Sequence, residues 1–201
     1  IEPFMINWRE AMERDFNHPS LVGWCPFNET WGTDHNQKAI SSVSAVYKMT
    51  KDLDPSRPVI DTSGLVHTER SDIFDVHDYE QDAKKFSAHY EKLSEGIVKD
   101  VPYADGYKGG PMFVSEYGGI GLKSDSGWSY GEAPEDADAL IRRYDELTTF
   151  LLENPDIFAF CYTQLYDIEQ EVNGLYTYDR VPKMDISKIR AINEKTAAIE
   201  K

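Results

Sequence analysis

Two short apolar runs that each end in an acid decide the fold: PMFVSEYGG at residues 111–119 and LVGWCPFNE at residues 21–29. Each run is typical of a buried β-strand, with Glu116 and Glu29 at the strand ends. A carboxylate just past a buried parallel strand lies on the face where α/β barrels place their catalytic groups. Because burying an acid is costly unless the acid is paired or functional, two acids in matching positions predict a chemical site.

Helical and strand-like segments alternate along the chain, which predicts an α/β domain with a parallel sheet. The predicted helices span residues 3–16, 34–53, 83–98, 134–152 and 186–199. The predicted strands span residues 21–27, 59–61, 73–77, 112–115 and 157–162. The longest loops follow strands rather than precede them, which is the arrangement that builds a site in a barrel.

The spacing of the two glutamates supports a barrel. Glu29 and Glu116 are 87 residues apart (116 − 29), and one βα unit of an eightfold barrel takes about 31 residues. Three units therefore separate them, with the strands at 59–61 and 73–77 in between. A complete barrel needs about 250 residues, so we expect a partial (β/α)8 barrel with about five parallel strands, forming one domain over residues 1–201.

The composition limits the partners. A formal net charge of −15 argues against nucleic acid and against an anionic membrane surface, because no basic stripe is present. No window reaches the roughly 18 apolar residues of a membrane span, and no signal peptide is visible. The chain begins at Ile1 rather than Met, so we expect a piece of a larger protein, whose compartment stays open.

Cys25 and Cys161 are the only cysteines, and both lie inside apolar runs. We expect two buried free thiols that pack as small apolar groups. Their spacing supports neither a disulfide nor a metal site.

Two carboxyl groups about 5–5.5 Å apart can hydrolyse a glycosidic bond with retention. One gives a proton to the leaving oxygen, and the other attacks the anomeric carbon. Strands three units apart in an eightfold barrel face each other across its mouth, so their terminal side chains can converge. The alternative is that two of the 36 acidic residues follow strands by chance.

Three segments, in order, resemble glycoside hydrolase family 2, the β-galactosidase and β-glucuronidase family. Residues 17–29, which run from Asn-His-Pro-Ser through Trp24 to Asn28-Glu29, are similar to its fourth strand. Residues 114–119 (Val-Ser-Glu-Tyr-Gly-Gly) resemble its seventh strand, and residues 160–175 resemble its eighth strand and following loop. The resemblance covers nearly the whole chain and implies strands four to eight of a catalytic TIM barrel. The first three strands and the accessory β-sandwich domains would then be absent from it.

The resemblance implies a role for each matching residue. Glu29 would be the general acid/base and Glu116 the nucleophile, while Asn28 would hold the sugar 2-hydroxyl and Tyr79 would donate a hydrogen bond to the nucleophile. Tyr79 would keep Glu116 ionised, and the neighbouring charge would raise the pKa of Glu29 toward roughly 6. Tyr79 as a loop aromatic and Asn28 as a loop cap remain alternatives. For His77 we favour packing or hydrogen bonding over catalysis.

Aromatic rings suit a sugar site because the C–H faces of a pyranose pack on them. The candidates are Trp31, Trp128, Tyr130 and Tyr162, although Tyr162 stands where the family more often has Trp. Trp24 lies inside a predicted strand and is expected in the core.

The loop after the last predicted strand bears on the sugar. β-Glucuronidases read the sugar carboxylate with an Asn-x-Lys element, and residues 171–174 lack the lysine. An acidic sugar would instead meet Glu169 and Glu171, so a neutral sugar such as galactose is favoured. No metal constellation or cofactor motif is visible, and we expect neither in this chain.

The resulting hypothesis is a retaining exo-β-glycosidase, β-galactosidase-like, that acts on a carbohydrate by double displacement. An endo-acting retaining β-glycanase and a catalytically inactive structural fragment are the alternatives. We expect the isolated 201 residues to be inactive. Two open sheet edges also predict self-association, or pairing with the missing half of the barrel.

Overall fold

The chain divides into two units, Ile1–Val76 and His77–Lys201, in a computed structural model that describes residues 1–30, 36–68, 70–124 and 127–201. The first unit holds helices α1 (Glu2–Asp15) and α2 (Gln37–Leu53). The second holds most of the sheet and the remaining helices. Whether residues 1–201 form a single domain stays a prediction.

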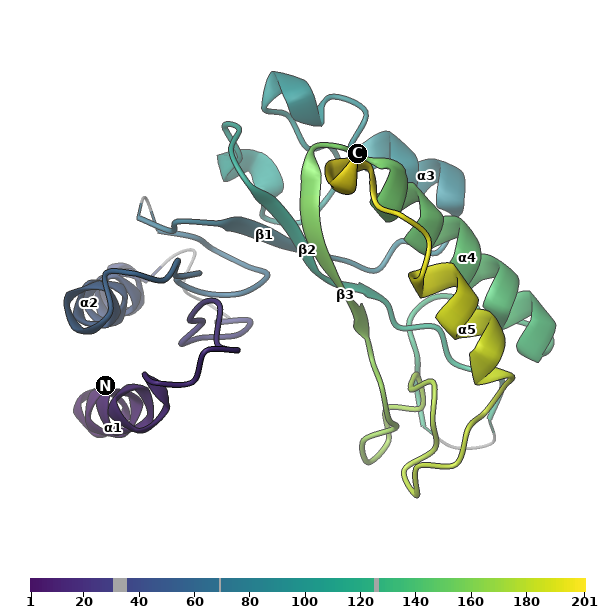
Figure 1. Ribbon diagram of the computed structural model, residues 1–201, viewed down its shortest axis with the longest axis horizontal. Helices are drawn as coiled ribbons and strands as arrows, with labels where there is room; N and C mark the ends of the chain where they lie inside the picture. Colours follow the sequence, from purple (N-terminus) through teal and green to yellow (C-terminus); the bar gives the residue numbers. More distant parts are fainter. Residues whose placement is uncertain (31–35, 69, 125–126) are drawn as a thin grey trace. The chain divides into compact units, whose positions relative to one another are not determined.

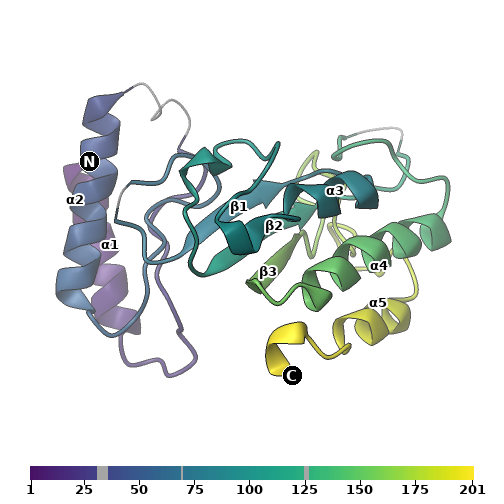
Figure 2. The same cartoon turned by 90° about the horizontal axis from the view of Figure 1, so that it is seen from above.

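The two helices of the first unit pack side by side (Figures 1 and 2). Their shared core contains Met12, Trp24, Tyr47 and Val59. Two indole nitrogens in or against this core donate hydrogen bonds, from Trp8 to Thr50 at 2.9 Å and from Trp24 to Asp54 at 2.8 Å. Trp24 therefore belongs to the core, as its place in the sequence predicts.

The predicted strands at 21–27 and 59–61 are wrong as regular strands. The two segments run parallel but meet only in isolated bridges, Trp24 with Val59 and Asn28 with Ser63. Proline explains the gaps, because Pro26 lies between the two bridges and has no N–H to continue the ladder.

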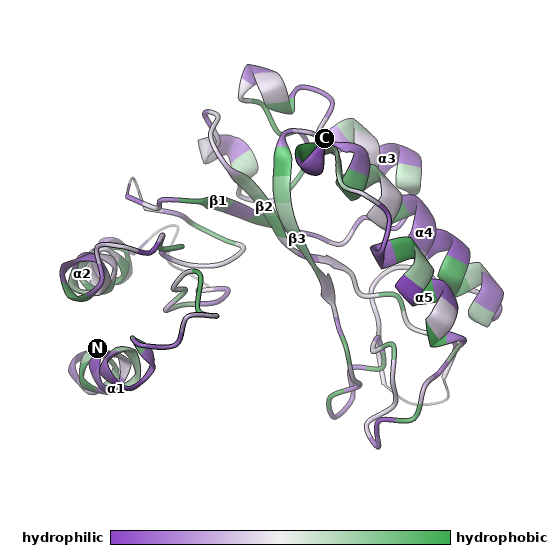
Figure 3. Ribbon diagram, in the orientation of Figure 1, coloured by the Kyte–Doolittle hydropathy of each residue, from purple (hydrophilic) through white to green (hydrophobic). Residues whose placement is uncertain are grey.

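The sheet has three strands in the order β1 (Phe74–Asp78), β2 (Met112–Gly118) and β3 (Ile157–Thr163). β2 and β3 are parallel, with Met112 opposite Ile157 and Gly118 opposite Thr163. In Figure 3, green marks the hydrophobic residues of these two strands. The predicted strands at 73–77, 112–115 and 157–162 are thus present, and β2 continues past its predicted end.

Helices α3 (Ala83–His89), α4 (Ala137–Glu153) and α5 (Ile186–Asn193) lie along one side of β2 and β3 (Figure 1). An aspartate side chain caps each helix N-terminus: Asp82, Asp136 and Asp185. Because Asp136 is the cap, α4 begins at Ala137 rather than at the predicted residue 134. Within the described residues, no helix is long and apolar enough to cross a membrane.

The predicted helices at 83–98 and 186–199 are too long. α3 stops at His89 and is followed by a 3₁₀ turn, Leu93–Glu95, which Gly96 ends in a left-handed conformation (φ 77°). α5 stops at Asn193, before a 3₁₀ turn at Ala198–Glu200. Apolar residues that continue the helical pattern past His89 and Asn193 therefore lie in short turns rather than in the helices.

Cys25 and Cys161 are free thiols, but the prediction that they are buried is wrong, because both are exposed. Side chains along an extended segment point alternately to opposite faces. Cys25 lies between the buried Trp24 and Pro26 and points the other way. An apolar run therefore does not bury every member.

Candidate active site

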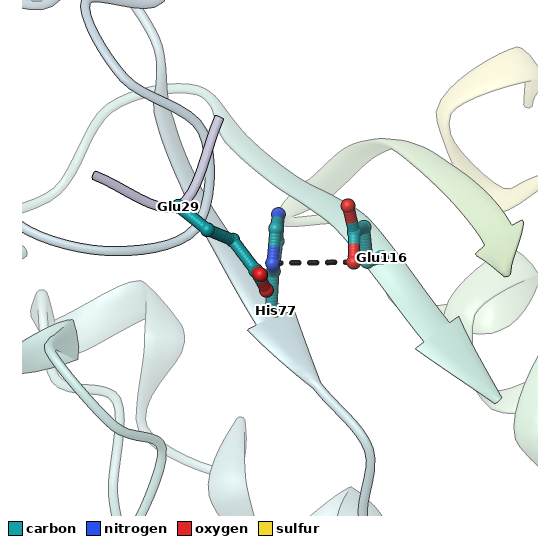
Figure 4. Close-up of side chains that lie close together, drawn as sticks. All are labelled: Glu29, His77 and Glu116. Atoms are coloured by element: carbon teal, nitrogen blue, oxygen red, sulfur yellow. Dashed lines mark ion pairs between the residues drawn. The ribbon is translucent and has the colours of Figure 1, made fainter. Parts of the chain in front are cut away.

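Glu116 lies near the carboxyl end of β2, two residues before the strand ends at Gly118. Its side chain is one-quarter exposed, and its Oε2 atom lies 3.2 Å from Nδ1 of His77 on the neighbouring strand β1. Figure 4 shows this pair, with β1 and β2 pointing the same way. Parallel strands thus bring a carboxylate and a buried imidazole within ion-pair distance. That His77 packs or hydrogen-bonds rather than takes part in catalysis stays a prediction.

Tyr79, just beyond the end of β1, donates its hydroxyl proton to the same Oε2 atom of Glu116. Burial raises the pKa of Tyr79, and the hydrogen bond to Glu116 raises it further. The phenol therefore stays protonated over the physiological range and always offers a donor. Its contact with Glu116 is the one that the family resemblance implies.

The ring of Tyr79 is stacked flat on the ring of Tyr130, with 3.5 Å between centroids and 1° between planes. Gly119 lies against both rings and has φ 63°, so a Cβ there would meet Tyr130 and Tyr79. The backbone N–H of Tyr130 donates to the carbonyl of Gly119 at 3.0 Å. Tyr130, a sugar-facing candidate in the sequence, thus holds Tyr79 in place.

A polar bridge supports the same region from the helix layer. Gln81 donates its amide N–H to the carbonyl of Gly118. Arg143 on α4 donates to Gln81 Oε1 at 3.1 Å and to the carbonyl of Glu132 at 2.8 Å. Nothing in the sequence pattern points to Gln81 or Arg143, because their meeting depends on the path of the long loop after β2.

The predicted aromatic platforms differ in their surroundings. Trp31 lies outside the described residues. Trp128 is 41% exposed and edges against Tyr130, with ring centroids 5.3 Å apart. Two backbone hydrogen bonds, from its N–H to Gln170 at 2.7 Å and from Val172 to its carbonyl at 2.9 Å, fix it to the loop after β3.

The side chain of Tyr162, on β3, packs against α4, with its ring centroid 4.9 Å from that of Tyr144. Its ring centroid is also 5.5 Å from that of Tyr117 on β2. Its hydroxyl accepts a hydrogen bond from the N–H of Ile120 at 3.3 Å. Both ends of this side chain are therefore engaged by protein, which differs from the expectation of a sugar platform.

The loop after β3 contains a lysine that the sequence analysis missed. Lys183 donates to Asp167 Oδ1 at 2.5 Å and to the carbonyl of Val172 at 2.9 Å. Its side chain is 11% exposed. The loop therefore has a lysine outside residues 171–174, but the charge of Lys183 is paired with that of Asp167.

Glu29 belongs to the first unit, and Glu116 to the second. Glu29 has φ 42°, an uncommon conformation for a residue with a side chain, and its N–H donates to the carbonyl of Ser63 at 2.9 Å. Asn28 forms the bridge to Ser63 and is exposed. The separation of about 5–5.5 Å between the two carboxyl groups that retention requires stays a prediction.

The sequence matches the family described as "Glycosyl hydrolases family 2, TIM barrel domain" over residues 3–197. The chain belongs to this family. It is 27% identical over 197 residues to a β-glucuronidase of Streptococcus agalactiae, which covers 90% of this chain and 33% of that protein. It is also 37% identical over 71 residues to a β-galactosidase of Photobacterium profundum, a match to 35% of this chain and 6% of that protein.

The structure is similar to the β-D-glucuronidase of Dictyoglomus thermophilum, with a TM-score of 0.72 and 21% identity. The match covers 100% of this chain and 36% of the other. This family 2 chain therefore has the fold of part of a TIM barrel. It spans about a third of the length of the Streptococcus agalactiae and Dictyoglomus thermophilum proteins.

Proposed function

We propose that this chain carries the catalytic carboxyl groups of a retaining exo-β-glycosidase, with Glu116 as nucleophile and Glu29 as general acid/base. The contact of Glu116 with Tyr79 and His77 carries the proposal. A carboxylate that accepts from a permanently protonated phenol is favoured in its ionised form, as a nucleophile requires. Membership of family 2 supports the same assignment.

In the first step, an oxygen of Glu116 bonds to the anomeric carbon while Glu29 gives its proton to the leaving oxygen. The glycosidic bond breaks, and a covalent glycosyl-enzyme remains. In the second step, Glu29 takes a proton from water, and the water oxygen bonds to the anomeric carbon. Glu116 leaves as the carboxylate, and the net configuration is retained.

Tyr79 and His77 limit the motion of Glu116 because they reach it from the adjacent strand. A nucleophile held in this way needs little rearrangement to attack, which is where positioning contributes to rate. Asn28 is proposed to hold the sugar 2-hydroxyl. Trp128, exposed and fixed by backbone hydrogen bonds, is the proposed aromatic platform in place of Tyr162.

A neutral sugar suits the loop after β3. Glu169 and Glu171 are negative, and the nearby Lys183 is neutralised by Asp167. A uronate carboxylate would therefore be repelled by these two glutamates, and the charge of Lys183 is already paired. The sugar that we propose is galactose or a close neutral relative. The second candidate is a glucuronide, because the relative aligned along 90% of this chain is named as a β-glucuronidase.

The test compares Glu116→Gln with wild type in the full-length protein that carries this chain. Turnover of an aryl β-galactoside should fall by about 10⁴-fold or more, since glutamine is not a nucleophile here. A 2-fluoro galactoside should label wild type on Glu116. Glu153→Gln, an exposed glutamate at the end of α4, is the matched control and should keep full activity.

Activity retained in Glu116→Gln would contradict the nucleophile assignment. Faster wild-type turnover of an aryl β-glucuronide than of the β-galactoside would select the second candidate.

A further inference from the structure

A buried histidine in the first unit lies between two buried aspartates. Nδ1 of His67 is 2.8 Å from Asp61 Oδ1, and Nε2 is 2.9 Å from the carbonyl oxygen of Asp75 and 3.2 Å from its Oδ1. The side chain of His67 is 6% exposed, and both aspartate side chains are 0% exposed. These three residues are called the His67 cluster below.

The partners of His67 fix its protonation. Both ring nitrogens face groups that only accept hydrogen bonds, so both nitrogens carry a proton and the ring is an imidazolium. Burial alone would lower the pKa of His67, but the hydrogen bonds to Asp61 and Asp75 outweigh it and raise the pKa to about 10. The cluster is therefore charged throughout the neutral pH range.

Asp75 connects the cluster to Ser63. Its Oδ2 atom accepts from the hydroxyl of Ser63 at 2.8 Å and from the N–H of Gly64 at 3.1 Å. Buried carboxylates that accept several hydrogen bonds in this way are held in one orientation, because each lost bond would leave a buried polar group unpaired. Asp75 thus fixes the side chain of Ser63 and the backbone after it.

Ser63 in turn holds the backbone on both sides of Asn28. Its N–H donates to the carbonyl of Phe27 at 2.8 Å, and its carbonyl accepts from the N–H of Glu29 at 2.9 Å. Glu29 has φ 42°, a conformation that persists only where the surroundings impose it. The backbone of Glu29 is therefore tied, through one residue, to a buried ionic cluster.

We propose that the His67 cluster is a positioning device for Glu29, acting through Ser63. By fixing Ser63, it sets the left-handed backbone of Glu29 and hence the direction in which the carboxyl group projects. His67, Asp75 and Ser63 are positioning residues, because none of them needs to touch the sugar. The inference rests on the proposed role of Glu29 as the general acid.

The experiment uses Ser63→Ala in the full-length protein. This change removes the hydroxyl bond to Asp75 and keeps the backbone, and His67→Gln removes the charge as a second variant. The matched control is Ser56→Ala in the same unit, because Ser56 likewise donates its hydroxyl, at 2.5 Å, to a buried aspartate, Asp54. Both the N–H and the hydroxyl of Ser56 donate to Asp54 rather than to the His67 cluster, so Ser56→Ala should leave the kinetics unchanged.

The readout is kcat/KM for two glycosides of the preferred sugar, one with a dinitrophenyl and one with a phenyl leaving group. Dinitrophenolate leaves without protonation, whereas the phenyl glycoside depends on the acid. A displaced Glu29 should therefore lower kcat/KM for the phenyl glycoside by about tenfold to 100-fold and change the dinitrophenyl value by less than about threefold. A loss of folded protein would lower both values equally. Rates are therefore compared at equal concentrations of folded protein.

Glu29→Gln serves as the reference. If Glu29→Gln shows no dependence on the leaving group, the proposed function is wrong. If Glu29→Gln shows this dependence but Ser63→Ala and His67→Gln then lower both substrates equally, or behave like Ser56→Ala, the positioning role of the His67 cluster is overturned.

Discussion

Tyr79 makes two contacts with different consequences. Its hydroxyl donates to Glu116, while its ring lies flat on Tyr130. The ring stack is a packing interaction that a phenylalanine would preserve, whereas the hydrogen bond acts on the carboxylate itself. The two contacts can therefore be separated by removing one oxygen atom.

Tyr79→Phe should lower kcat for an aryl glycoside by about 10²-fold, the usual loss when one donor to a reacting oxygen is removed. Thermal unfolding should shift little, because the ring still stacks on Tyr130. Tyr144→Phe is the matched control, since it loses a hydroxyl bond of 2.8 Å to Asn193 between α4 and α5. Equal kcat values for the two variants would show that Tyr79 has no special relation to Glu116.

The end of β2 depends on close packing between a glycine and a ring. Gly118 has φ 85°, and a Cβ at this position would overlap the ring of Tyr162 on β3. The register supports this approach, because Gly118 pairs with Thr163, next to Tyr162. Glycine is therefore required here for its conformation and for its size.

Gly118→Ala should lower the free energy of unfolding by about 3 kcal/mol, from left-handed strain and overlap with Tyr162 together. Gly109→Ala separates the two causes. Gly109 has φ 95°, but among the described residues other than its chain neighbours no atom lies within 4 Å of its Cβ position, so strain alone should cost about 1 kcal/mol. Chemical denaturation of both variants gives the comparison, and equal losses would exclude the steric contribution.

Periodicity predicts the helices and central strands well because these elements bury one continuous stripe or face. The strands predicted at 21–27 and 59–61 are wrong, because the apolar run around Pro26 indicates burial but not a continuous ladder of backbone hydrogen bonds. The helix ends predicted at residues 98 and 199 are also wrong, because apolar residues in short turns continue the helical pattern. The local hydrophobic pattern therefore predicts which residues are buried better than it predicts which backbone groups are hydrogen-bonded.

The same distinction applies to the candidate site. Glu116 ends a recognisable apolar run, and the resemblance to family 2 singles out Tyr79 just beyond another one, so both can be named from the sequence. His67, Asp61 and Asp75 share no element and no periodic spacing, and only the fold brings them together. The stack of Tyr79 on Tyr130 is likewise hidden, because it depends on how a long loop returns.

Because the chain is strongly acidic, the pH dependence of its folding stability above neutrality reports mainly on its basic groups. At pH 7 the formal net charge is −15, and the acidic groups are already ionised, so a further rise in pH changes few carboxylates. Deprotonation of a buried imidazolium would then remove a positive charge from between two aspartates. His67 is therefore expected to contribute strongly to the pH dependence of folding above neutrality.

The sign follows from linkage. A histidine whose pKa is raised to about 10 by folding contributes its full stabilisation below its unfolded pKa of about 6.5, and loses it as the pH rises through about 10. His89, whose pKa is raised by Asp78, adds a change of the same sign. The free energy of unfolding should therefore decline from pH 6.5 to 10.

The His67 share is isolated by comparing urea unfolding of wild type and His67→Gln at pH 6, 8 and 10. The variant should be less stable at pH 6 and should approach wild type as the pH rises, because wild type alone loses the imidazolium. His18→Gln, a change at a ring that is 63% exposed, is the control for replacing a histidine outside the buried cluster. If His67→Gln runs parallel to wild type across this range, the ring is not a buried cation, and the electrostatic account of how Ser63 and Glu29 are held fails with it.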